Sequence, residues 1–117
     1  MSKHSDKVLL QHMLLAGQRI GEYLHGLSKD RFMAYSMVQD AVVRQLEIIG
    51  EAASKLSDDF CRAHPEIPWR RVVGMRNRLI HGYFGVDYDI VWETATSEVP
   101  RLIEQIRSIL AEAHDDS

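Results

Sequence analysis

Cysteine is almost absent from this chain of 117 residues, which contains only Cys61. A single cysteine cannot form a disulfide within the chain, so the sequence favours a reducing compartment. Long apolar runs are absent as well, and none approaches the roughly 20 residues that a membrane-spanning helix needs. The polar region around Met1 does not resemble a secretory signal, which begins with a basic segment followed by an apolar core. We therefore expect a cytoplasmic protein that is not a membrane protein.

Positive charge is also limited, because 14 Lys and Arg residues face 17 Asp and Glu residues, for a formal net charge of -3. Proteins that coat nucleic acids through a broadly basic surface need clustered Lys and Arg. This overall balance argues against such a protein. The stretch 62–81 is the exception, since Glu66 is its single acid beside five arginines: Arg62, Arg70, Arg71, Arg76 and Arg78. Any contacts with phosphate groups are expected there.

Apolar residues recur at spacings of three and four along most of the chain, which is the pattern of helices with one buried face. Four stretches show it, and a fifth is expected to form only a short turn. The predicted helices span 8–27, 28–57 (either continuous or broken near 35–37), 59–63, 68–80, and 87 onward with a kink at Pro100 and a frayed tail from Glu112. Ser5, Ser28 and Asp87 are the expected N-caps, and Gly26 is the expected stop signal of the first helix. The predicted fold is all-α, an antiparallel bundle of four to five helices in one domain over residues 1–117.

Two glycines, Gly17 and Gly21, lie four residues apart on the first predicted helix. Residues with this spacing share a helix face, so the pair either lets another helix approach closely or is merely tolerated.

The segment from Arg76 to Tyr83 combines a fixed cation, an amide, an imidazole and a phenol near one predicted helix end. Arginine can stabilise the charge that develops on a phosphoryl oxygen, and a histidine that titrates near neutral pH can transfer a proton to or from a ribose hydroxyl. RNA provides its own nucleophile, the 2′-hydroxyl, so this chemistry does not strictly require a metal. The alternative is that His81 and Tyr83 bond to backbone groups at the helix end while the arginines are solvated.

Helix geometry limits how these residues can cooperate. At about 100° per residue, Asn77 and His81 share a face, whereas Arg76 and His81 point well apart in a regular helix. Arg76 and His81 can converge if the helix unwinds near Gly82, or if two subunits supply them across a two-fold axis. We favour the second arrangement, which predicts a homodimer.

The pattern Arg-x4-His-x-Tyr, formed by Arg76, His81 and Tyr83, resembles the signature of the HepT-like family of HEPN ribonucleases. Residues 46–53 resemble the second helix of that family, and residues 76–77, 79–86 and Trp92 resemble its third and fourth helices. The resemblance implies a HEPN-like fold and a dimeric site that cuts RNA without a metal or other cofactor. It also implies a toxin of a toxin-antitoxin system, with a minimal nucleotidyltransferase as the antitoxin.

By this resemblance, Arg76 and His81 match the family's catalytic positions, and Tyr83 is similar to the tyrosine that the antitoxin modifies with AMP. We expect Asn77 to orient one of the catalytic pair. The residues expected to guide the RNA are Arg70, Arg71 and Arg78. The rival interpretation is a non-catalytic helical module that binds a nucleotidyltransferase partner or a nucleotide.

A second polar group, Asp40, Arg44, Glu47 and Glu51, forms a row at helical spacing. The row is either a metal site, a salt-bridged polar stripe, or part of a dimer groove near Arg76. We favour the stripe, because carboxylates at helical spacing are common on solvated helix faces. The remaining histidines lack the spacing of a metal site, so no metal is expected: His4, His12, His25, His64 and His114.

Overall fold

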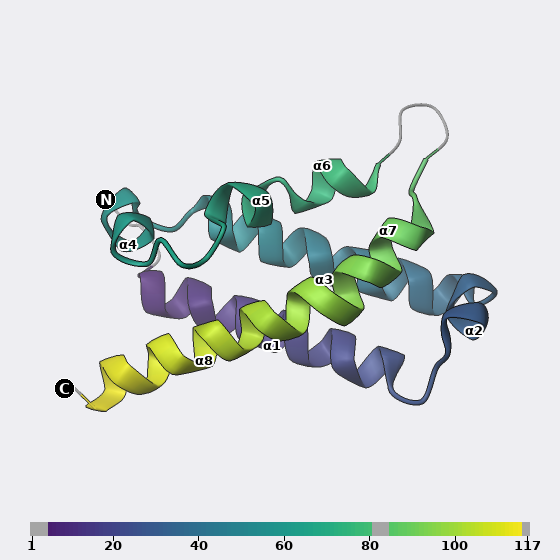
Figure 1. Ribbon diagram of the computed structural model, residues 1–117, viewed down its shortest axis with the longest axis horizontal. Coiled ribbons are helices and arrows are strands. Elements are labelled where there is room, and N and C mark those ends of the chain that lie inside the picture. Colours follow the sequence, from purple (N-terminus) through teal and green to yellow (C-terminus); the bar gives the residue numbers. More distant parts are fainter. Residues whose placement is uncertain (1–4, 81–84, 116–117) are drawn as a thin grey trace.

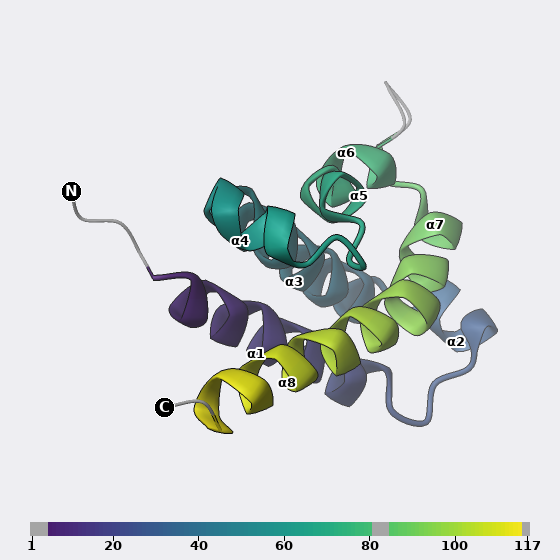
Figure 2. The same ribbon diagram turned by 60° about the vertical axis from the view of Figure 1, so that its left-hand side comes forward.

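Three long helical segments form the frame of the computed structural model, which describes residues 5–80 and 85–115 (Figure 1). Helix α1 (Asp6–Leu24) runs antiparallel to α3 (Ser36–Ser54) and packs against it. The third segment continues from α7 (Tyr88–Glu93) through η2 (Thr94–Glu98) into α8 (Val99–Asp115), and α8 packs on α1 (Figure 2). No strand occurs in the described ranges, so the all-α prediction is confirmed.

The first two helix boundaries follow the predicted caps. The Ser5 hydroxyl accepts a hydrogen bond from the Val8 amide, and Ser28 does the same for Arg31 at the start of α2 (Lys29–Met33). Gly26 follows the end of α1 with a φ of +77°, the left-handed conformation that glycine adopts without strain. The predicted capping roles of these residues are confirmed.

Of the two alternatives for the segment 28–57, the broken helix is present, with the break at the junction of α2 and α3. Tyr35 has φ -117° and ψ 85°, outside the helical region. The Gln39 side chain donates a 3.0 Å hydrogen bond to the Met33 carbonyl, so an acceptor left open by the end of α2 is satisfied. Helix α3 ends at Ser54 rather than at 57, and Ser57 instead caps the short α4 (Asp58–Ala63).

The single helix predicted over 68–80 is wrong, because the structure divides it at Gly74 into α5 (Trp69–Val73) and α6 (Met75–Leu79). The reason lies in the contact with α3. A Cβ on Gly50 would lie 3.3 Å and 3.4 Å from the carbonyl oxygens of Val72 and Val73. The end of α5 therefore approaches the backbone of α3 closely, and α6, which begins directly after Gly74, also contacts α3.

Helix α6 ends at Leu79, earlier than the glycine stop signals suggested. Ile80 is extended, with φ -101° and ψ 130°, and forms an isolated antiparallel bridge with Val86. The Asp87 amide donates a 2.7 Å hydrogen bond to the Leu79 carbonyl. The predicted shared face of Asn77 and His81 required a helix through residue 81, so that geometric argument does not apply. Predictions for His81 and Tyr83 fall outside the described residues.

The last helical segment is interrupted before Pro100, as predicted. Proline has no amide hydrogen and its ring collides with the preceding turn of a regular α-helix. The chain passes through η2, a π-helical turn in which the Val99 amide bonds to the Thr94 carbonyl. The tail was expected to fray from Glu112, but α8 continues to Asp115, so this prediction is wrong for residues 112–115. Ile106 and Ile109 are buried, which anchors the last turns of α8.

The core lies where α1, α3 and the α7–α8 segment meet. Fully buried apolar side chains come from all three, namely Met13, Ile20, Val42, Leu46, Ile49, Val91, Val99 and Ile106, and Phe32 of α2 and Met75 and Leu79 of α6 are buried as deeply. A Cβ on Gly17 would overlap Ile103 of α8, whereas one on Gly21 would meet nothing within 4 Å. The close helix approach predicted from the glycine pair is confirmed at Gly17 only. None of the helices in the described ranges is long and apolar enough to cross a membrane.

Candidate functional site

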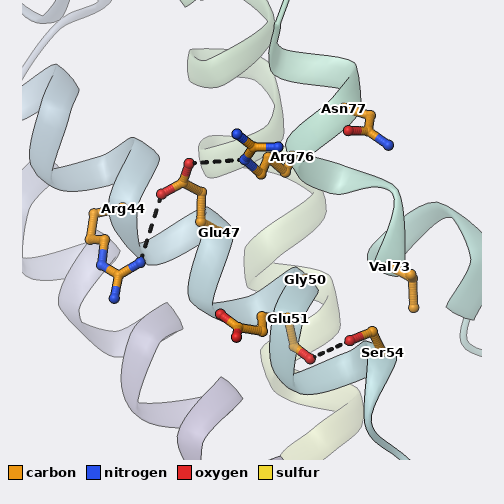
Figure 3. A pocket seen from close by; sticks show the side chains of 8 residues that line it. All are labelled: Arg44, Glu47, Gly50, Glu51, Ser54, Val73, Arg76 and Asn77. Atoms are coloured by element: carbon orange, nitrogen blue, oxygen red, sulfur yellow. Dashed lines mark hydrogen bonds and ion pairs between the residues drawn. The ribbon is translucent and has the colours of Figure 1, made fainter.

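A cavity of about 350 Å³ opens between α3 and the α5–α6 pair, and it contains two of the predicted site residues (Figure 3). It is lined by Arg44, Glu47, Gly50, Glu51, Ser54, Val73, Arg76 and Asn77. Two cations and two carboxylates face this space, so its formal charge is balanced.

Arg76 lies at the start of α6 and is tied to α3 through Glu47. Its Nε donates a hydrogen bond to Glu47 Oε2 at 3.3 Å, and its side chain remains 61% exposed. Arg44 Nη1 lies 3.8 Å from the other oxygen of the same carboxylate. Figure 3 shows the Glu47 carboxylate between the two guanidinium groups. Glu47 therefore contacts Arg76 at its Nε edge, and most of the Arg76 side chain remains exposed.

The polar row on α3 is a salt-bridged stripe that lies beside Arg76. Arg44, Glu47 and Glu51 line the cavity, whereas Asp40 is exposed and lies outside its lining. Glu51 is 3.8 Å from Lys55. The favoured ion-pair interpretation is confirmed for Arg44, Glu47 and Glu51, and a role of the row in a dimer groove stays a prediction. Across residues 5–80 and 85–115, no three His, Cys, Asp or Glu side chains are grouped so that they could hold a metal ion.

Asn77 follows Arg76 on α6 and is exposed. Its amide points away from the Glu47 carboxylate in Figure 3. Within the described part of the chain, no hydrogen bond joins Asn77 to Arg76. The predicted orienting role of Asn77 stays a prediction, because His81 lies outside the described residues.

A second cluster, which the sequence analysis missed, joins Arg71 and Arg78 to Glu98. The Arg71 guanidinium bonds to both oxygens of Glu98, with Nε at 2.9 Å and Nη2 at 2.8 Å. Arg78 reaches the same two oxygens at 3.2 Å and 3.3 Å. The hydrogen bonds from Arg71, and then those from Arg78, lower the pKa of Glu98, while its partial burial opposes the shift. The sequence carries little signal for this cluster, because Glu98 lies 20 residues beyond Arg78 and belongs to no motif.

The three arginines predicted to guide RNA differ in their surroundings. Arg70 is exposed on α5, and no ion pair involves it within the described ranges. Arg71 and Arg78 are already bonded to Glu98, and the Arg78 side chain is only 26% exposed. Arg70 is thus the one of the three with no carboxylate partner in the described ranges, and RNA contacts by all three remain predictions.

Comparisons with known proteins agree on one family. A family model described as Ribonuclease HepT-like matches residues 13–109. The chain is 43% identical over 101 residues to a protein of Caldanaerobacter subterraneus subsp. tengcongensis that is named as a candidate RNase. That match covers 86% of this chain and 90% of the relative.

An archaeal relative from Thermococcus cleftensis, named "Probable ribonuclease HepT", is 43% identical over 100 residues, which is 86% of this chain and 91% of the relative. A protein of Methanocaldococcus jannaschii that is also named as a candidate RNase is 36% identical over 109 residues, or 93% of this chain and 100% of the relative. No solved structure matches the chain.

Proposed function

The chain belongs to the HepT-like ribonuclease family, and from this premise we propose that it is a metal-independent endoribonuclease with Arg76 and His81 as its catalytic pair. One observation carries the proposal. Glu47 holds the Nε edge of Arg76 while the side chain stays 61% exposed at the cavity. A guanidinium held in this way presents its Nη groups to a phosphate without losing its orientation.

The proposed reaction uses the ribose 2′-hydroxyl as the nucleophile. The 2′-oxygen attacks the adjacent phosphorus, the bond from phosphorus to the 5′-oxygen breaks, and the products carry a 2′,3′-cyclic phosphate and a 5′-hydroxyl. His81 transfers the protons of this exchange, and Arg76 stabilises the negative charge on the phosphoryl oxygens. Asn77 orients one member of the pair.

The site is proposed to be composite, with Arg76 and His81 supplied by the two subunits of a homodimer. The apolar exposure around Arg76 supports a covered surface there. Val73 is 41% exposed and lines the cavity, and Ile80 is 40% exposed just beyond α6. Exposed apolar side chains next to a polar site are typical of surfaces that another chain covers.

The first test is RNA cleavage by purified protein in excess chelator. Arg76→Ala and His81→Ala should each reduce cleavage at least about 100-fold, because each removes a group that acts only in the transition state. Wild-type protein should leave 2′,3′-cyclic phosphate ends. Arg107→Ala is the matched control, because Arg107 lies outside the stretch 62–81 and pairs with Glu104 on the exposed surface of α8. Cleavage by either site variant at the wild-type rate would contradict the assignment, and no cleavage by the wild type would favour the non-catalytic module.

The biological role that we propose is that of a toxin in a toxin-antitoxin system. A minimal nucleotidyltransferase would neutralise it by transferring AMP to Tyr83. Tyr83 lies two residues after His81 in the sequence, so the added phosphate would compete for the arginines that act on RNA.

The proposed switch can be tested by co-expression with a cognate nucleotidyltransferase. Tyr83→Phe removes the hydroxyl that accepts AMP. This variant should therefore remain toxic under the co-expression conditions that silence the wild-type protein. Mass spectrometry of the co-expressed wild type should show one AMP on Tyr83. AMP on another residue, or a silenced toxin without AMP, would disprove the role of Tyr83.

A further inference from the structure

Two arginines from two short helices converge on one carboxylate beside the proposed catalytic helix. Arg71 lies on α5 and Arg78 on α6, and both bond to Glu98, the last residue of η2. All four nitrogen-to-oxygen distances fall between 2.8 Å and 3.3 Å. This Glu98 cluster is therefore a direct link from the α5–α6 pair to the last helical segment.

The Glu98 cluster is partly buried, so water cannot easily take over the hydrogen bonds that Glu98 makes with the two arginines. The side chains of Arg78 and Glu98 are only 26% and 29% exposed. The Nε of Arg78 is buried and has no hydrogen-bond partner within the described residues. Removing the charge of Glu98 would leave two neighbouring guanidinium groups without the anion that separates them, and one of them would be poorly hydrated.

The helix that carries Arg76 depends on such external links. Helix α6 has five residues, and a helix of that length is not stable in isolation. Met75 and Leu79 bury one face of α6 in the core. Beyond this apolar contact, α6 is held at Arg76 by Glu47 of α3 and at Arg78 by Glu98 of η2.

We infer that Glu98 is a positioning residue for RNA cleavage, which sets the direction of α6 and thereby the direction in which Arg76 faces the cavity. This inference rests on the proposed function and extends it. For Arg78 it also favours a structural role over RNA guidance, because Glu98 engages both of its Nη groups and the side chain is only 26% exposed.

The test compares Glu98→Gln with Glu104→Gln in the full chain. Glu104 is the matched control, because it lies on α8 and pairs with Arg107 of the same helix at 2.8 Å. Cleavage of a defined RNA is measured well below the unfolding temperature of each variant. Glu98→Gln should lower kcat about tenfold with little change in KM, since a small misplacement of a catalytic group costs rate more than binding. Glu104→Gln should behave like the wild type.

A second measurement does not depend on cleavage. Amide hydrogen exchange over residues 75–79 should be faster in Glu98→Gln than in the wild type, and unchanged in Glu104→Gln. If the wild type cuts no RNA, the proposed function fails and the exchange result alone decides whether Glu98 holds α6. Unchanged exchange together with wild-type kcat would overturn the inference.

The same variants distinguish positioning from RNA contact. If Arg71 and Arg78 are RNA ligands, Glu98→Gln frees them, so RNA binding tightens and its salt dependence becomes steeper. That outcome would also overturn the inference. Glu98→Asp keeps the charge with a shorter side chain and should recover part of kcat. If Glu98→Gln does not fold, Glu98→Asp decides by the same kcat and exchange measurements, and wild-type values for both would disprove the positioning role.

Discussion

At the scale of single residues, the orientation of Arg76 depends on a partner 29 positions earlier in the chain. The Glu47 carboxylate accepts from Nε and leaves the rest of the guanidinium accessible. An arginine without this contact would sample several rotamers and lose the alignment that a phosphoryl transfer site requires. The ion pair is partly exposed, so its contribution to stability is small, and its main effect is on geometry.

Replacing Glu47 with Ala should therefore reduce cleavage much more than it reduces stability. We expect kcat to fall about tenfold, while the free energy of unfolding changes by no more than about 1 kcal/mol. Single-turnover cleavage and urea unfolding measure the two effects. Glu51→Ala is the control, because Glu51 lines the same cavity and pairs only weakly with Lys55 at 3.8 Å. Equal losses of activity in the two variants would show that Glu47 has no special relation to Arg76.

At the scale of helices, short elements are positioned by longer ones. The α5–α6 pair follows α3 because Gly50 lets the Val72 and Val73 carbonyls approach its backbone. On the opposite side of the frame, Gly17 lets α8 approach α1, with Ile103 against the glycine backbone. An added Cβ would overlap the Ile103 side chain at Gly17 and would lie 3.3 Å and 3.4 Å from two carbonyl oxygens at Gly50, so both contacts favour a residue without a side chain.

The contact at Gly17 predicts opposite effects for two otherwise similar substitutions in α1. Gly17→Ala places a methyl group against Ile103, which is only 6% exposed, so it should destabilise the protein by about 1–3 kcal/mol. Gly21→Ala meets no atom within 4 Å and should stabilise the protein by about 0.5–1 kcal/mol through helix propensity. Chemical unfolding of both variants tests the pair. Stabilisation by Gly17→Ala would show that α1 and α8 are not closely packed in solution.

At the scale of the whole molecule, a composite site predicts complementation between inactive subunits. In a mixed dimer of Arg76→Ala and His81→Ala, one of the two sites contains both intact residues. Random mixing makes half of the dimers mixed, so about one quarter of the wild-type activity should return. Cleavage is measured after the two variants are unfolded together and refolded. A site made within one subunit would give no recovery, and mixing the wild type with itself controls for losses on refolding.

The sequence by itself determined the helical class, most helix starts and the interruption before Pro100. These features depend on local physical chemistry: apolar spacing, side chains that cap a helix, and a residue without an amide hydrogen. It also determined the family, because the residues that carry the resemblance lie close together in the chain.

Tertiary structure alone decided the division at Gly74, the partner of Arg76 and the capture of Arg71 and Arg78 by Glu98. Each depends on residues that are far apart in the sequence and on where α3 and η2 run in space. A salt bridge between helices that are far apart in the sequence leaves no periodic pattern. The sequence around an arginine also does not show whether its side chain contacts solvent, RNA or a carboxylate. The relative placement of packed helices therefore determines which arginines are accessible to a substrate, and composition and spacing do not record that placement.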